Sequence, residues 1–213
     1  MVSFFRGSIM NESQGKAPDD FNRCADFHGH VCPGLAIGYR AAKAGLAWLQ
    51  EHRAPDEELV ALVETDACGV DAVQVLTGCT FGKGNLVYKD YGKQVYTFLG
   101  RRTGKGVRVA LKDGAVEMSD AHRNLMQKIR EDTATEAERE TFWANHRKAS
   151  YDVLEKPLED LFTVQASDTR LPGKAKIEPS VLCSVCGEPT MRSKMVEVSG
   201  RNLCRECAEK ARG

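Results

Sequence analysis

The chain has 213 residues, 42 % of them hydrophobic and 28 % charged, so it can bury a core without disulfide bonds. Its 30 Lys and Arg residues balance 30 Asp and Glu residues, which argues against nucleic acid as a partner, because such binding needs clustered positive charge. No apolar run approaches the roughly 18 residues of a membrane-spanning helix, and residues 1–10 lack the features of a signal peptide. We therefore expect a cytoplasmic protein of one or two domains that does not contact a membrane.

The first half of the chain alternates polar and periodic segments. Residues 1–17 are polar, and we expect them to be disordered or extended. The clearest helical spacing lies in residues 33–52, where apolar residues recur every three or four positions after Pro33, which suits a first helical turn. The elements expected in this half are helices over 18–26 and 33–52, a buried strand over 59–63 and a helix over 70–76.

The next segment changes to strands and then to amphipathic helices. Turn residues at 89–92 separate two strands, and Thr135 with Glu138 has the spacing of a helix capping box. Strands and helices mix without a βαβ repeat, so residues 18–162 are expected to form an α+β domain. The expected elements are strands over 85–88, 94–98 and 107–111, helices over 120–131 and 134–149, and a short helix over 151–161 that Pro157 weakens.

Residues 163–180 are polar and contain Pro172, Gly173 and Pro179, which predicts a linker to a small domain over 181–213. That domain holds two CxxC pairs separated by 17 residues. Each pair can direct two thiolates at one point, and tetrahedral zinc takes four such ligands, so we predict a structural zinc. The predicted ligands are Cys183, Cys186, Cys204 and Cys207.

Local patterns in this small domain predict a treble-clef-like finger. They indicate a strand over 195–198, a turn at 199–200 and a helix that starts at Cys204. A segment this short cannot fold by apolar burial alone, so the metal would supply folding energy. Iron–sulfur binding and a redox-active CxxC are the alternatives. Arg192, Lys194 and Arg201 could contact phosphate in a docking role, although a solvated face is the simpler interpretation.

Four further cysteines lie in the first domain: Cys24, Cys32, Cys68 and Cys79. If residues 28–32 are extended, alternation points His28, His30 and Cys32 to one side. Cys32 and Cys68 each precede a predicted helix, whose positive end would lower a thiol pKa. Cys24 is more simply a small buried hydrophobe, and Cys79 is balanced between that role and a metal ligand.

Polar residues near these cysteines could complete a site. Asp66 and Asp71 are candidates to hold a ligating histidine. Lys83 with the N–H groups of Gly82 and Gly84 could bind an anion that Asn85 helps to orient, but their spacing is not that of a P-loop. The remaining histidines, His52, His122 and His146, lie in charged helical contexts and are assigned to the surface.

Three sequence blocks carry a resemblance to a known family. They read FHGHVCPGL at residues 27–35, DACGVDAVQ at 66–74 and TGCTFGKGNL at 77–86. In this order they resemble the formylmethanofuran dehydrogenase E-subunit family, over about residues 18–160, and the CxxC pairs look like the zinc finger that some members append. The resemblance implies a thioredoxin-like layout with a mixed sheet flanked by helices.

The resemblance also implies a metal-capable site made by the His/Cys motifs and association with a molybdenum or tungsten formylmethanofuran dehydrogenase. No molybdopterin-binding pattern is visible, so the dehydrogenase reaction itself is not carried over. We expect zinc or another transition metal on His30, Cys32 and Cys68, with His28 and Cys79 next. Cys32, Cys68 and Lys83 are the candidate catalytic residues.

Two functions from different classes fit the sequence. The first is a metal-binding accessory protein of a one-carbon oxidoreductase, or an enzyme acting on an unknown small molecule. The alternative is a docking adaptor or metallochaperone without catalysis. Exposed edges of a mixed sheet also allow a homodimer.

Overall fold

The computed structural model describes residues 17–175 and 177–211, so the expectation for residues 1–16 lies outside the described residues. The chain divides into two compact units, Met1–Lys174 and Ala175–Gly213. The described residues of the first unit are called the core domain below, and those of the second are called the finger.

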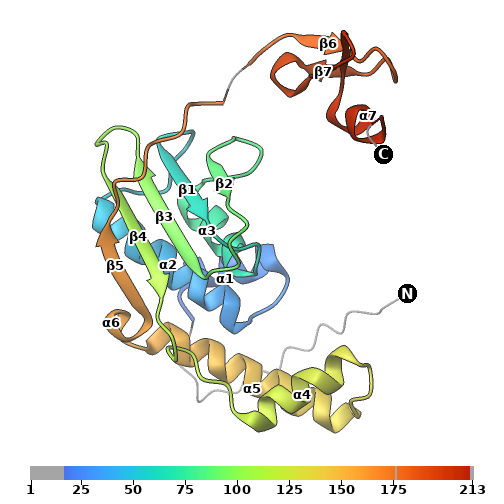
Figure 1. Ribbon diagram of the computed structural model, residues 1–213. Helices are drawn as coiled ribbons and strands as arrows, with labels where there is room; N and C mark the ends of the chain where they lie inside the picture. Colours follow the sequence, from blue (N-terminus) through green and yellow to red (C-terminus); the bar gives the residue numbers. More distant parts are fainter. Residues whose placement is uncertain (1–16, 176, 212–213) are drawn as a thin grey trace. The chain divides into compact units, whose positions relative to one another are not determined.

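A five-stranded mixed sheet forms the centre of the core domain, with the order β2-β1-β3-β4-β5 (Figure 1). The pair of β1 with β2 is parallel, whereas β1 with β3, β3 with β4 and β4 with β5 are antiparallel. The strands are β1 (Leu59–Val63), β2 (Leu86–Tyr88), β3 (Val95–Gly100), β4 (Gly106–Leu111) and β5 (Phe162–Ala166).

The turn residues at 89–92 join two strands that do not pair with each other. β1 lies between β2 and β3, so the connection passes across the end of β1. Backbone hydrogen bonds of 2.8 Å from Lys89 N–H to Val63 C=O and from Lys93 N–H to Glu64 C=O fix this crossing. The end of β1 that leads to Cys68 is thereby closed by the same connection.

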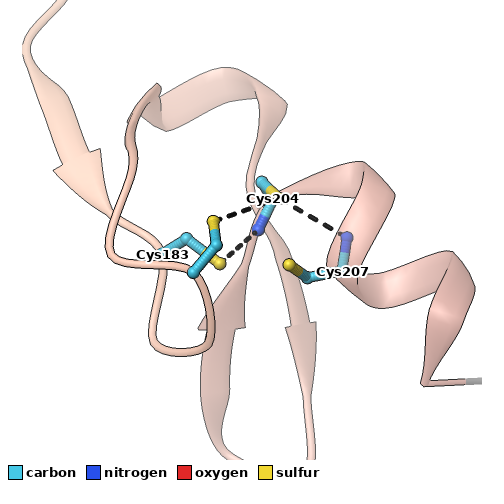
Figure 2. A group of neighbouring side chains, drawn as sticks. Cys183, Cys204 and Cys207 are labelled. Atoms are coloured by element: carbon cyan, nitrogen blue, oxygen red, sulfur yellow. Dashed lines mark hydrogen bonds between the residues drawn. The ribbon is translucent and has the colours of Figure 1, made fainter.

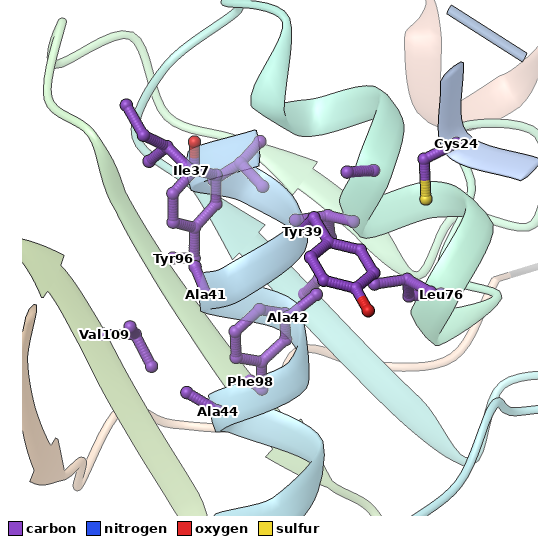
Figure 3. Packing of buried hydrophobic residues seen from close by; sticks show 14 of the residues in the cluster. Cys24, Ile37, Tyr39, Ala41, Ala42, Ala44, Leu76, Tyr96, Phe98 and Val109 are labelled. Atoms are coloured by element: carbon purple, nitrogen blue, oxygen red, sulfur yellow. The ribbon is translucent and has the colours of Figure 1, made fainter. Parts of the chain in front are cut away.

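Three helices pack on the sheet and on one another: α1 (Asp19–His28), α2 (Pro33–Leu49) and α3 (Gly69–Thr77). The α2 helix lies against β3, and a Cβ at Gly45 would come within 2.2 Å of the Phe98 ring (Figure 3). It crosses α3 as closely, since a Cβ at Gly38 would lie 2.1 Å from the carbonyl oxygen of Gly69. These glycines allow backbone contact that a side chain would prevent.

Two further helices, α4 (Asp120–Arg130) and α5 (Glu136–Glu155), form a hairpin that joins the core through α2. The capping box of Thr135 and Glu138 is present, as its spacing predicts. Arg40 of α2 donates a 2.8 Å hydrogen bond to the carbonyl of Val153. The α5 helix extends beyond the expected residue 149, and Pro157 then caps the one-turn helix α6 (Leu158–Leu161).

The expected linker over 163–180 is wrong at its start. Residues 162–166 form β5, which adds an antiparallel edge strand to β4 with Val109 paired to Val164. Its sequence, FTVQA, is short and half polar, so only the partner strand identifies it as a strand. The core domain therefore continues past residue 162.

The finger consists of two small hairpins and a helix. The hairpins pair β6 (Ser180–Leu182) with β7 (Pro189–Met191), and β8 (Val196–Val198) with β9 (Arg201–Leu203). Ser199 and Gly200 make the second turn with φ of 52° and 73°. A short 3-10 turn, Arg192–Lys194, joins the hairpins, and α7 (Arg205–Lys210) follows with Cys204 as its N-cap.

The predicted fold class is confirmed: an α+β core with a mixed sheet and helices, followed by a small C-terminal unit. Among the described helices, none combines the length and the apolar character needed to cross a membrane.

Candidate metal sites

The finger brings its four cysteines to one point. One ligand atom from each of Cys183, Cys186, Cys204 and Cys207 lies within 4.8 Å of all the others, and Figure 2 shows three of them converging between the knuckle and α7. The sulfurs of Cys186 and Cys204 are 4.0 Å apart. Tetrahedral zinc with bonds near 2.3 Å holds sulfurs about 3.8 Å apart, so this group fits zinc.

Backbone N–H groups prepare these sulfurs for negative charge. Cys204 N–H donates to Cys183 Sγ at 3.2 Å, and Cys207 N–H donates to Cys204 Sγ at 3.4 Å (Figure 2). Hydrogen bonds from backbone N–H groups, chiefly that of Cys204, lower the pKa of Cys183 to about 6. The neighbouring thiols, Cys204 first, instead raise the pKa of Cys207 to about 12. A divalent cation removes this conflict, because it favours the thiolate at every ligand.

A second group of ligand atoms lies between α1 and α2 in the core domain. One ligand atom from each of His28, His30 and Cys32 lies within 4.8 Å of the others, and we call these residues the core triad. His28 Nε2 and Cys32 Sγ are 3.8 Å apart, whereas a nitrogen and a sulfur on one tetrahedral zinc are roughly 3.5 Å apart. His30 is exposed and Cys32 is buried, so the triad has one open side.

The core triad forms by a different route from the expected extended segment. His28 is the last residue of α1, and Gly29 ends that helix in the left-handed region with φ of 95°. Cys32 is the extended N-cap of α2, and its sulfur accepts from Leu35 N–H at 3.4 Å. Alternation along a strand therefore did not gather these residues; the turn between two helices did.

An acidic residue from α3 holds the first ligand. His28 Nδ1 is 2.7 Å from a carboxylate oxygen of Asp71, whose other oxygen accepts from Gln74 at 3.3 Å. Nδ1 therefore carries the proton, which leaves the lone pair of Nε2 directed at Cys32. Carboxylate–histidine pairs of this kind orient metal-binding imidazoles in proteins.

The thiol of Cys32 shows which of two effects dominates. The expectation of a lowered pKa at the helix start is wrong, because burial raises the pKa of Cys32 to about 12 despite the Leu35 hydrogen bond. Its neighbour Cys68 raises the pKa of Cys32 further. The residue is only 3 % exposed. Without a cation the sulfur is a neutral thiol at pH 7.

Cys68 lies beside this group without belonging to it. It is the N-cap of α3, and a Cβ at Gly34 of α2 would lie 3.3 Å from its Cβ and 3.7 Å from its sulfur. The close crossing of α2 and α3 thus brings the N-caps of two helices together. Cys68 is half-buried, so it borders the open side of the triad.

The third sequence block lies at the far end of α3. This helix has nine residues, which at 1.5 Å each separate its two ends by about 13 Å. Cys79 is fully buried in the hydrophobic core, and burial raises its pKa. Lys83 Nζ and Asn85 Nδ2 both donate to the carbonyl of Asp56, at 3.2 Å each.

The predicted anion site therefore is not assembled near the core triad. Gly84 N–H is bonded to Phe81 C=O, and no Cβ contact arises within 4 Å of Gly82. Asn85 is buried and holds the residue 56–59 segment through its hydrogen bonds. Asp66 is exposed and acts electrostatically on Tyr88 rather than on a histidine.

Cys24 is a buried core residue, as its simpler interpretation predicts. It is fully buried, and its sulfur donates to the carbonyl of Asp20 at 3.2 Å. Burial, with the charge of Asp20, raises its pKa to about 11.

The surface assignment of His122 is wrong. His122 is 4 % exposed and stacks on Phe142 of α5, and its Nε2 lies 3.2 Å from Nδ1 of the half-buried His146. The ring of Trp143 lies edge-on to both His146 and His30. Sequence reasoning missed this cluster; the signal was that His146 and Phe142 share one face of α5 at a spacing of four residues.

Comparisons with known proteins give the same division of the chain. Residues 27–163 match the family described as "FmdE, Molybdenum formylmethanofuran dehydrogenase operon". Residues 176–212 match the prokaryotic dksA/traR C4-type zinc finger. The second match assigns the four-cysteine group to a zinc finger.

Two similar proteins extend these matches. A protein of Archaeoglobus fulgidus named "Probable S-adenosyl-L-methionine-binding protein" is 33 % identical over 196 residues, which is 87 % of this chain but only 51 % of that relative. The chain therefore spans about half the length of the curated relative. A crystal structure of an FmdE-like protein of tungsten formylmethanofuran dehydrogenase from Syntrophus aciditrophicus has 25 % identity and a TM-score of 0.59, covering 89 % of this chain and 90 % of that one.

The resemblance inferred from the three sequence blocks is thereby confirmed over most of the core domain. The chain belongs to the FmdE family and carries a C4-type zinc finger after its core domain.

Proposed function

We propose that the core domain holds a transition metal, with zinc the best fit, through His28 Nε2, His30 and Cys32. The observation that carries this proposal is the convergence of their three ligand atoms within 4.8 Å, with His28 held by Asp71. Imidazole and thiolate are the ligands that borderline metals such as zinc select. A structural zinc site has four protein ligands, so a site with three is suited to binding a further ligand.

When bound, the metal would act as a Lewis acid toward a small molecule in the fourth position. The protein's own groups would then orient that molecule. Cys68 borders the open side and supplies a thiol there, and the exposed His30 borders the same side. Lys83 and Cys79 take no part in this proposal, because α3 separates them from the triad.

We further propose that the protein is accessory to a molybdenum or tungsten formylmethanofuran dehydrogenase-like complex. The family description and the FmdE-like structural relative support this role. Co-expression with the catalytic components of such a complex, followed by size-exclusion chromatography, tests it. Co-elution is expected, and separate elution of intact components contradicts it. The order of hairpins and α7 also supports a treble-clef finger, and a homodimer remains a prediction for sedimentation analysis.

The metal proposal is tested by counting metal in the full chain. After zinc loading and desalting, we expect two zinc ions per chain by mass spectrometry of the elements. Cys32→Ala should leave one, whereas Cys24→Ala, which removes a cysteine outside the triad, should leave two. One zinc in the wild-type chain would overturn the proposal. A parallel titration with S-adenosylmethionine, named for the half-matched relative, shows whether that ligand binds this chain.

A further inference from the structure

A pair of imidazoles lies on the α4–α5 hairpin, outside the core triad. His122 Nε2 and His146 Nδ1 are 3.2 Å apart. Phe142 stacks on both rings, with ring centroids 5.1 Å from His122 and 4.9 Å from His146. Packing therefore fixes both rings, and the hydrogen bond between them determines which nitrogen of each ring carries a proton.

The pair connects to the core triad through His146. The Trp143 ring is T-shaped to His30 at 6.1 Å and to His146 at 6.0 Å. His30 itself lies 4.5 Å from the His28 ring, and it acts electrostatically on His146. Trp143 is 46 % exposed, so solvent and small molecules reach this side of the triad.

The partners of His122 select one tautomer of the pair. Among the described residues, its Nδ1 is a buried side-chain nitrogen with no hydrogen-bond partner. A proton on that atom would be a buried donor without an acceptor, which proteins avoid more strictly than a buried lone pair. His122 therefore carries its proton on Nε2 and donates it to His146 Nδ1. His146 must then carry its own proton on Nε2.

The same arrangement keeps the pair neutral. An additional proton would have to enter at His122 Nδ1, where no acceptor stabilises it. Burial also lowers the pKa of both imidazoles, and the charges of His122 and His30 lower that of His146 further. His146 is thus a hydrogen-bond donor with a fixed direction rather than a general base.

We propose that His146 is a positioning residue whose Nε2–H, set by His122, binds an oxygen atom of a small carboxylate at the core triad. The inference rests on the proposed metal site and names the class of ligand for it. A cation held by the triad and a neutral N–H donor nearby both favour an oxygen atom that bears negative charge. The second carboxylate oxygen can face the cation while the first accepts from His146.

The test uses the full chain with one equivalent of zinc added first for the finger and Co²⁺ then added for the core. Acetate is titrated as the probe, and the visible absorption of Co²⁺ reports its binding. His146→Phe should weaken acetate binding about tenfold, the effect of losing one hydrogen bond to a charged group. His146→Gln, which keeps a donor at the same distance from the backbone, should restore most of the affinity. Both variants should bind Co²⁺ as the wild-type chain does.

The outcomes separate this inference from the metal proposal. Unchanged acetate affinity in His146→Phe, with normal Co²⁺ binding, overturns the role of His146 and leaves the metal site intact. Failure of the wild-type core to take up Co²⁺ overturns both. Loss of Co²⁺ from His146→Phe also overturns it, because the residue would then support the metal rather than the ligand. Nitrogen-15 spectra of the wild-type histidine rings check the tautomer without any variant, and a proton on His146 Nδ1 contradicts it.

Discussion

Among single residues, Asp71 decides how His28 is presented to a metal. Its carboxylate fixes the proton on Nδ1 at a distance of 2.7 Å. Asp71→Asn removes the negative charge while it keeps the size of the side chain. We expect the affinity of the core domain for zinc to fall 10- to 100-fold, the usual effect of losing such a partner, while the finger keeps its zinc. Competition with a chromophoric chelator measures both affinities.

Asp66→Asn is the matched control, because Asp66 is exposed and acts electrostatically on Tyr88. It removes the same charge from the same segment without touching His28. Equal zinc affinities for the two variants would show that the His28–Asp71 contact does not orient a ligand.

A pH effect is expected from Cys24, which belongs to neither metal group. Burial and Asp20 raise its pKa from 9.0 to about 11 in the folded state. The folded chain therefore holds this proton more tightly, so stability is complete below pH 9 and falls as the pH rises toward 11. Between pH 7.5 and 10.5 the wild-type chain should lose about 2 kcal/mol that Cys24→Ala does not lose.

Urea unfolding at the two pH values measures this difference. Phe21→Leu is the control, because Phe21 is a buried residue of the same helix without a titrating group. It should lower the free energy of unfolding equally at both pH values. Parallel pH dependence in Cys24→Ala and the wild-type chain would contradict the raised pKa.

Some site residues could be predicted from the sequence and others could not, for physical reasons. His28, His30 and Cys32 are so close along the chain that either an extended segment or a tight interhelical turn gathers them. Cys79 and Lys83 depended on where α3 would end, and a nine-residue helix carried them away. His122 looked exposed because its neighbours are polar, whereas its burial depends on the partner helix α5.

At the scale of elements, the crossing of α2 and α3 sets the geometry of the core site. A Cβ at Gly38 would lie 2.1 Å from the oxygen and 2.3 Å from the Cα of Gly69. Gly38→Ala therefore forces the helices apart, and we expect a loss of about 1–3 kcal/mol in the free energy of unfolding. The N-caps Cys32 and Cys68 should separate with them, so zinc affinity in the core should fall as well.

Gly82→Ala is the corresponding control. Nothing lies within 4 Å of a Cβ at Gly82, so its effect on the free energy of unfolding should stay within about 0.5 kcal/mol. Denaturant unfolding and zinc competition measure both variants. Equal stability of Gly38→Ala and the wild-type chain would mean that the two helices do not depend on close backbone contact.

Elements with strong local signals were predicted well, and those defined by a partner were not. The spacing in residues 33–52 predicted α2, and the Thr135–Glu138 box predicted the start of α5. The strand β5 has no comparable local signal, because its five residues alternate only weakly and its pairing with β4 is far away in the sequence. The position of β1 between β2 and β3 likewise depends on pairing that no local pattern encodes.

At the scale of the whole molecule, the two units differ in what stabilises them. The core domain has an extensive buried cluster, whereas the buried residues of the finger's cluster are Cys183, Leu203 and Ala208. The finger unit spans residues 175–213, and domains of about 40 residues rarely fold by apolar burial alone. Its folding free energy should therefore come from zinc, and that of the core should not.

Cys207→Ser tests this division in the full chain. Removing one of four thiolate ligands should abolish zinc binding by the finger and unfold it, because little apolar surface remains to hold its hairpins. The amide resonances of residues 180–210 should collapse toward random-coil positions, while those of β1, β3 and β4 stay in place. His28→Ala is the reciprocal variant and should remove the core metal while the finger resonances stay unchanged. If Cys207→Ser instead lowered the melting temperature of the core domain, the two units would form one cooperative structure.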